Sequence, residues 1–238
     1  MRLRVKLRTT TGKTFFVPHG ILQQGLTAIV YDIFKGADPS FAAWLHDGGW
    51  KGEDTPRLKL FAYSRLFAFT RVVNEQGIFF GDPEVHFYLS SPDPRVISAF
   101  SAGAVMVSGL SLGETELKVV AVEPIKAPDI RRGYLEVTTL SPFIISDSRT
   151  SPSSQYRFLL LDREPELVLS RLIENARLKW LCYGGDPGAF SLNITPLQAR
   201  NKYIHHAGLA LDFGDYTANS RLLTCLLRKS LRYSSGDR

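Results

Sequence analysis

The first eight residues alternate between apolar and cationic side chains, and this period of two strongly limits how the chain can fold. Leu3, Val5 and Leu7 are separated by cations at positions 2, 4, 6 and 8. Because successive side chains of a β-strand point to opposite faces, the segment predicts a strand with one buried face and one basic face. The basic face is either a solvated sheet surface or a surface that contacts RNA, and both interpretations stay open.

The rest of the first half predicts the order strand, helices, strands, helix, strand. We expect a helix over about residues 19–35, a short helix from Pro39 to the Gly48-Gly49 pair, β-type runs at 58–62, 65–73, 77–80 and 85–89, a helix after Ser91-Pro92, and a strand at 116–123. Asp38 suits the N-cap of the short helix, since its carboxylate can accept a backbone hydrogen bond. The order is the β-α-β-β-α-β pattern of a ferredoxin-like unit.

The second half predicts a looser repeat of the same plan. We expect β-type runs at 135–145 and 156–161, a helix at 164–183, strands near 190–194 and 203–213, and a last helix at 219–230. Few residues remain after that helix, so this half is expected to lack a full last strand. The prediction is therefore an α+β protein of two tandem ferredoxin-like (RRM-like) halves, with domains at residues 1–128 and 129–238.

The basic composition favours a polyanionic partner. The 238 residues include 29 Lys and Arg against 23 Asp and Glu, which gives a formal net charge of +6. Cys182 and Cys225 lie outside any metal-ligand pattern, so we expect neither a metal nor another cofactor. The sequence has no disulfide framework, which fits a protein of the reducing cytoplasm. It also has no run of about 18 apolar residues, so we expect no transmembrane helix and no membrane partner.

Five tracts occur in an order that is typical of one known family. They are LTAIVYDIFKGADPSFAAWLHDGGWKG at 26–52, LKLFAYSRL at 58–66, LSSP at 89–92, TLSP at 139–142 and EPELVLSRLIENARLKWLCYG at 164–184. With them the chain resembles the CRISPR-associated repeat-processing endoribonucleases of the RAMP superfamily. The resemblance spans most of the chain and implies the same duplicated ferredoxin-like fold.

The resemblance also implies an activity in antiviral defence, the cleavage of precursor CRISPR RNA within its repeats. The family needs no metal: a ribose 2′-hydroxyl attacks the adjacent phosphate and leaves a 2′,3′-cyclic phosphate and a 5′-hydroxyl. The matching catalytic positions are Tyr31, His46 and Lys51. A histidine has a pKa near working pH, and a lysine can stabilise charge on the phosphorane. From the residues alone, Tyr31 could equally pack in the core, and His46 and Lys51 could be ordinary surface side chains.

One family feature, a glycine-rich loop near the C-terminus, is eroded here. Only Gly236 remains within residues 229–238. We therefore expect cations to replace the loop in binding RNA, namely Arg228, Lys229 and Arg232, with Arg65 and Lys202 as further contacts. The erosion keeps open an alternative function, a non-catalytic repeat-RNA-binding subunit of a CRISPR effector complex.

The expected partner is CRISPR repeat RNA, and subunits of an effector complex or a second copy in a homodimer stay open. A small-molecule enzyme on the same scaffold is a weaker alternative, because the sequence has no phosphate-binding loop, paired carboxylate motif or cofactor fingerprint. Specific RNA readers often stack unpaired bases on aromatic rings, and the sequence does not rank its candidates, Tyr63, Phe67, Tyr203 and Tyr233.

Overall fold

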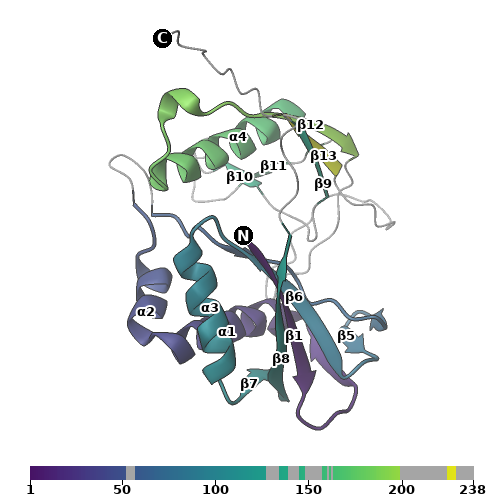
Figure 1. The fold of residues 1–238 in the computed structure, drawn as a ribbon. Helices are drawn as coiled ribbons and strands as arrows, with labels where there is room; N and C mark the ends of the chain where they lie inside the picture. Colours follow the sequence, from purple (N-terminus) through teal and green to yellow (C-terminus); the bar gives the residue numbers. More distant parts are fainter. Residues whose placement is uncertain are drawn as a thin grey trace. The chain divides into compact units, whose positions relative to one another are not determined.

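The computed structural model of the chain describes residues 1–51, 57–126, 134–138, 145–147, 157–159, 161, 163–198 and 224–228 (Figure 1). The chain divides into two compact units. The described residues up to 126 lie in the first unit, and those from 134 onwards lie in the second. The predicted domain boundary after residue 128 falls outside the described residues.

The first unit is built around a five-stranded antiparallel sheet with the order β3-β6-β1-β8-β7. A smaller antiparallel sheet has the order β2-β5-β4. The elements are β1 (Arg2–Thr9), β2 (Phe15–Pro18), α1 (His19–Ala37), α2 (Pro39–Asp47), β3 (Ala62–Tyr63), β4 (Arg71–Val73), β5 (Gly77–Phe80), β6 (Glu84–Ser90), α3 (Pro94–Met106), β7 (Leu110–Leu112) and β8 (Thr115–Ile125). The sequence predicted neither β2 nor β7.

The alternation in β1 divides the main sheet into an apolar inner face and a polar outer face. Leu3, Val5 and Leu7 are almost fully buried, and Val85, Phe87 and Leu89 of β6 line the same inner face. Helices α1 and α3 cover this face (Figure 1), and the Phe100 ring of α3 contacts both Phe34 of α1 and Phe87. The predicted strand with one buried and one basic face is confirmed.

Helices α1 and α3 pack so closely that only a glycine fits at their crossing. A Cβ atom added at Gly103 of α3 would overlap the carbonyl oxygen of Ile33 in α1. Gly36 of α1 lies at the same contact, where an added Cβ would be 3.2 Å from the Gly103 carbonyl oxygen. This contact fixes α1, which leads directly into α2.

Helix α2 begins and ends at residues suited to those positions. The Asp38 carboxylate accepts a hydrogen bond from the Phe41 backbone N–H at 3.0 Å, and Pro39 opens the helix, as predicted. After the helix, Gly49 has φ +66°, a conformation that side-chain-bearing residues rarely adopt. The turn there leads to the backbone pairing of Trp50 with Leu58.

Asp93 is the N-cap of α3, and its carboxylate makes the stability of the fold depend on pH. Asp93 is 2% exposed, and its carboxylate accepts hydrogen bonds from the Arg95 backbone and guanidinium. The Arg95 hydrogen bond holds the pKa of this carboxyl below its usual value. A lowered pKa means that the ionised carboxylate stabilises the fold above about pH 4, and that this contribution is lost as the pH falls through the lowered pKa.

We therefore expect Asp93→Asn, which keeps the cap but removes the charge, to lower the free energy of unfolding by about 1–3 kcal/mol at pH 7. The difference from the wild type should shrink as the pH falls below about 4 and through the lowered pKa, because the wild-type carboxylate then becomes protonated. Urea unfolding at several pH values measures this. An unchanged difference at all pH values would contradict the assignment.

The second unit contains a three-stranded antiparallel sheet with the order β12-β13-β9 and an antiparallel pair of β10 with β11. Its elements are β9 (Tyr134–Thr138), β10 (Ile145–Asp147), β11 (Arg157–Leu159), α4 (Pro165–Cys182), the short 3-10 helix η1 (Pro187–Ala189), β12 (Asn193–Gln198) and β13 (Thr224–Arg228). The predicted helix at 164–183 is confirmed as α4. The strand predicted at 203–213 lies outside the described residues.

The prediction of a last helix at 219–230 is wrong for residues 224–228. These residues form β13, which pairs with β12 on one side and with β9 on the other. A short apolar run does not distinguish a helix from a central strand by its periodicity, because both can be buried all round. This half was expected to lack a full last strand because residues 219–230 were assigned to a helix. Since residues 224–228 are a strand, that reason no longer holds.

The coarser fold prediction is confirmed: the chain is a mixed α+β protein with antiparallel sheets. Among the described helices, none is long and apolar enough to cross a membrane.

Candidate active site

Two of the three predicted catalytic residues lie in contact. Tyr31 comes from α1 and His46 from the last turn of α2, and their ring centroids are 5.3 Å apart in an edge-to-face arrangement. Tyr31 is 9% exposed and also contacts Phe34 and Phe61, whereas the His46 side chain is 66% exposed. The pair therefore joins a phenol held by the core to an imidazole at the surface.

Asp47 orients the imidazole of His46. Its carboxylate Oδ1 lies 2.6 Å from Nδ1 of His46. An ionised carboxylate can only accept a hydrogen bond, so the shared hydrogen belongs on Nδ1. In the neutral imidazole this leaves Nε2 as the acceptor, available to take a proton from another molecule.

The cation in contact with Tyr31 is Lys59, which was not among the predicted catalytic residues. Its Nζ donates a hydrogen bond to the Tyr31 hydroxyl oxygen at 2.9 Å and lies 5.3 Å from the ring centroid. The phenol accepts this bond through a lone pair, so its own hydrogen stays available to a further acceptor. Lys59 follows Leu58, whose backbone pairs with Trp50. It lies within the LKLFAYSRL tract, so the family resemblance was the signal in the sequence that could have indicated it.

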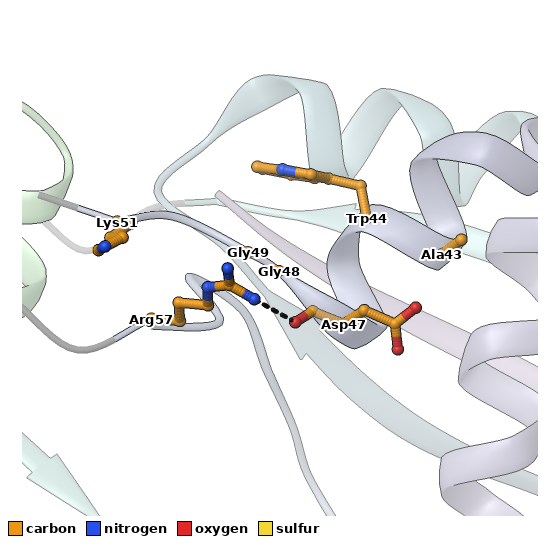
Figure 2. A pocket seen from close by; sticks show the side chains of 7 residues that line it. All are labelled: Ala43, Trp44, Asp47, Gly48, Gly49, Lys51 and Arg57. Carbon is orange, nitrogen blue, oxygen red and sulfur yellow. Dashed lines mark hydrogen bonds between the residues drawn. The ribbon is translucent and has the colours of Figure 1, made fainter.

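Lys51, the third predicted residue, lines an open pocket of about 460 Å³ beyond the end of α2. Figure 2 shows Lys51 and Arg57 on the same side of this pocket, while the Asp47 carboxylate points away from them. Arg57 donates a hydrogen bond to the Asp47 carbonyl oxygen at 3.2 Å. The pocket therefore has two cations in its lining, beside the C-terminal end of α2.

The predicted RNA-binding residues fall in different places. Arg65 is half-buried, and its guanidinium lies 5.2 Å from the centroid of the Phe67 ring. Burial, with a smaller contribution from Arg71, lowers the pKa of Arg65. Arg228 lies in β13, with its side chain outside the described part, and Lys202, Lys229 and Arg232 are outside the described residues.

The described residues contain no group of three or more His, Cys, Asp or Glu side chains arranged to hold a metal ion. The groups that come together around His46 are instead an imidazole, a carboxylate, a phenol and an ammonium. Fold and site thus define a class: an α+β protein with a surface histidine equipped for proton transfer, in contact with a tyrosine that binds a lysine, and with two further cations at the end of α2.

Comparison with known proteins shows which family this chain resembles. Residues 21–123 match the family model for the N-terminal part of the CRISPR-associated protein Cas6, type I-A, a range that contains Tyr31, His46, Lys51 and Lys59. A Cas6 endoribonuclease of Methanocaldococcus jannaschii is 26% identical over 143 residues, which are 60% of this chain and 52% of the relative. The chain thus spans about half the length of this curated relative.

Solved structures show the same fold. A CRISPR-associated Cas6 protein has a TM-score of 0.67 at 20% identity, over 96% of this chain and 86% of that one. A RAMP protein described as binding different RNA substrates has the same TM-score at 17% identity, over 98% and 89% of the two chains. A Cas6-related protein from Pyrococcus furiosus also has a TM-score of 0.67, at 18% identity, over 97% and 87%. The predicted resemblance is confirmed: residues 21–123 match the Cas6 family model, and the chain is similar in fold to Cas6 and RAMP proteins.

Proposed function

We propose that this protein is an endoribonuclease that cleaves precursor CRISPR RNA within its repeats. The observation that carries the proposal is the exposed His46 imidazole, hydrogen-bonded to Asp47 and in contact with Tyr31, inside the segment that matches Cas6. Base catalysis at a ribose needs an accessible nitrogen of this kind. RNA repeats carry the phosphates that the neighbouring cations can bind.

The reaction that fits this site is attack of the ribose 2′-hydroxyl on the adjacent phosphate. The 2′-hydroxyl proton passes to Nε2 of His46 as the new oxygen–phosphorus bond forms. The bond to the 5′-oxygen breaks, and that oxygen takes a proton from an ammonium, which we assign to Lys51. Tyr31 donates a hydrogen bond to a phosphate oxygen, and Lys59 adds positive charge that stabilises the phosphorane. The products are a 2′,3′-cyclic phosphate and a 5′-hydroxyl, and the reaction needs no metal.

We also propose that both units are ferredoxin-like. In the first unit, β1 lies between β6 and β8, its sheet neighbours, with α1 and α3 on one face, which supports a split β-α-β arrangement. In the second, the central position of β13 between β9 and β12, with α4 between β9 and β12 in the chain, supports the same plan. The cations Lys202, Arg228, Lys229 and Arg232 are proposed to add phosphate contacts from the second unit.

The test is incubation of the protein with its cognate repeat RNA in EDTA, followed by analysis of the product ends. Cleavage in EDTA that yields a cyclic phosphate supports the proposal. Tight, salt-sensitive binding without any product would instead favour a non-catalytic RNA-binding subunit. Cleavage that appears only when a divalent metal is added would contradict the proposed mechanism.

Asp47 should matter for the rate and not for RNA affinity. We expect Asp47→Asn to lower the cleavage rate by up to about 5-fold, because an exposed ion pair contributes up to about 1 kcal/mol to holding the imidazole. Asp32→Asn is the matched control, since Asp32 is also exposed and pairs with Lys35 on the surface of α1. Single-turnover cleavage assays compare the two, and equal rates for both variants would remove the role of Asp47.

A further inference from the structure

The pocket beyond the end of α2 contains an exposed indole together with its two cations. Trp44 is 37% exposed and lines this pocket with Lys51 and Arg57. Figure 2 shows the indole reaching from α2 toward the side of the pocket where the two cations lie. The pocket volume of about 460 Å³ falls within the range of roughly 300–1,000 Å³ that is usual for small-molecule sites. The pocket can therefore hold a ligand of the size of one nucleotide.

Neighbouring groups hold the indole of Trp44 in place. It stacks on the Phe41 ring, with centroids 5.5 Å apart and 26° between the planes. Trp50, which is 8% exposed, meets it edge-on with centroids 4.7 Å apart. A Cβ atom added at Gly48 would lie 3.4 Å from Cδ1 of the indole, so the main chain at the helix end also packs beside the ring. A ring fixed in this way loses little conformational entropy when a ligand binds to it.

The charge of the pocket suits a phosphate. Arg57 donates a hydrogen bond to the carbonyl oxygen of Asp47, which is a neutral group, while the Asp47 carboxylate pairs with His46. In Figure 2 this carboxylate points away from Lys51 and Arg57, so it does not neutralise them. The pocket thus combines an aromatic ring with positive charge, and a nucleotide has the complementary features, a flat base and phosphates.

Packing within the protein does not explain the exposed part of Trp44. The core contacts of α2 are supplied by Ala42 and Leu45, which are buried on the other side of the helix. The stack of Trp44 on Phe41 is an i,i+3 pair, which stabilises a helix only slightly. A smaller apolar side chain could make this contact while exposing less apolar surface to water.

We propose that this pocket binds the nucleotide directly downstream of the cut, with its base against the indole of Trp44 and its 3′-phosphate beside Arg57. The inference rests on the proposed function, in which Lys51 protonates the leaving 5′-oxygen. That oxygen belongs to the downstream nucleotide, so a lysine in the pocket lining places this nucleotide there. The inference adds a substrate-positioning residue, Trp44, which selects the phosphate that is presented to His46. Stacking tolerates any base, so Trp44 sets the position of the cut without reading the base.

The test uses repeat RNA in which 2-aminopurine, whose fluorescence falls when it stacks, replaces one base at a time. The protein carries His46→Ala, which keeps the RNA intact. We expect quenching at the nucleotide directly downstream of the cut that the wild type makes, and loss of this quenching when Trp44→Leu is added. The same change should weaken binding by about 5-fold or more, since a stacked base contributes about that factor. Trp44→Phe should keep most of the quenching, because it keeps an aromatic face.

Two further variants make this result decisive. Phe69→Leu is the matched control, since Phe69 is a fully exposed aromatic residue outside the pocket, and it should quench as the parent protein does. Trp44→Met is a second non-aromatic variant with high helix propensity, and its quenching should be lost as in Trp44→Leu even if the leucine variant folds poorly. Unchanged quenching in the folded Trp44 variants, or equal loss in Phe69→Leu, would overturn the proposal.

Cleavage assays separate this inference from the proposed nuclease function. With His46 intact, Trp44→Leu should need about 5-fold more RNA for half-maximal cleavage and should also cut at neighbouring phosphates, whereas Trp44→Phe should cut at the wild-type site. If the wild type cuts the repeat but no Trp44-dependent quenching follows the cut, this inference fails and the nuclease stands. If one position shows Trp44-dependent quenching but the wild type never cuts, the nuclease proposal fails and the base-binding pocket stands.

Discussion

Replacing His46 with alanine is expected to lower the single-turnover cleavage rate of repeat RNA by about 1,000-fold, while RNA affinity changes less than about 3-fold. The alanine removes the only imidazole in contact with Tyr31 among the described residues, and with it the proposed acceptor for the 2′-hydroxyl proton. The side chain is 66% exposed, so its removal leaves no cavity in the core. Rapid-quench cleavage assays and a binding titration measure the two quantities separately.

His19→Ala provides the matched control for this experiment. His19 is a partly exposed histidine at the start of α1, and its Nε2 lies 2.8 Å from the Asn74 carbonyl oxygen. Its removal should leave the cleavage rate within about 2-fold of the wild type. A His46→Ala enzyme that cleaves as fast as His19→Ala would exclude His46 as the base, because another group would then have to accept the 2′-hydroxyl proton.

Replacing Gly103 with alanine is expected to lower the free energy of unfolding by about 2–4 kcal/mol. The added methyl group would overlap the Ile33 carbonyl oxygen, so α1 and α3 must move apart. Alanine favours a helix over glycine by about 1 kcal/mol, and the clash must exceed this gain. Because α1 carries Tyr31, the same displacement should also lower the cleavage rate. Urea or thermal unfolding measures the stability.

Gly109→Ala is the control for the Gly103 experiment. A Cβ atom at Gly109 would meet no other atom within 4 Å, so its effect should lie within about 0.5 kcal/mol of zero. If Gly103→Ala is as stable as Gly109→Ala, the close contact between α1 and α3 is not rigid. The position of α1 would then need another explanation.

Local patterns predicted most of the first unit because each of its elements has a strong local signal. The alternation of Leu3, Val5 and Leu7 predicted β1 and its two faces. Asp38 and Pro39 predicted the start of α2, where the carboxylate accepts the expected backbone hydrogen bond. Strands β2 and β7 are short, at four and three residues, and pairing with a neighbour defines them more than their own sequence does.

The wrong prediction at residues 224–228 has the same physical origin. This apolar segment suits a helix and a buried strand equally well, and no local residue decides between them. Its conformation depends on β9 and β12, which supply backbone hydrogen bonds on both sides and come from much earlier in the chain. Such pairing is a tertiary property.

The sequence predicted part of the candidate site. The contacts that it did not predict join residues that only the fold brings together. Tyr31 and His46 were identified through the family resemblance, and α1 and α2 bring their rings into contact. Lys59 is 28 residues from Tyr31 in the chain, and only the folded structure shows its hydrogen bond to the phenol. The partner of His46 is Asp47, its neighbour in the sequence, but adjacency alone does not orient a carboxylate toward Nδ1.

The sequence by itself determined the helices with clear caps, the two-faced first strand, the basic character and the family resemblance. Each of these depends on side chains a few positions apart, whose periodicity or chemistry acts locally. Only the tertiary structure decided the strand order, the strand at 224–228 and the Lys59–Tyr31 hydrogen bond. These features join residues that are far apart in the chain, and the packing of the whole unit brings them together.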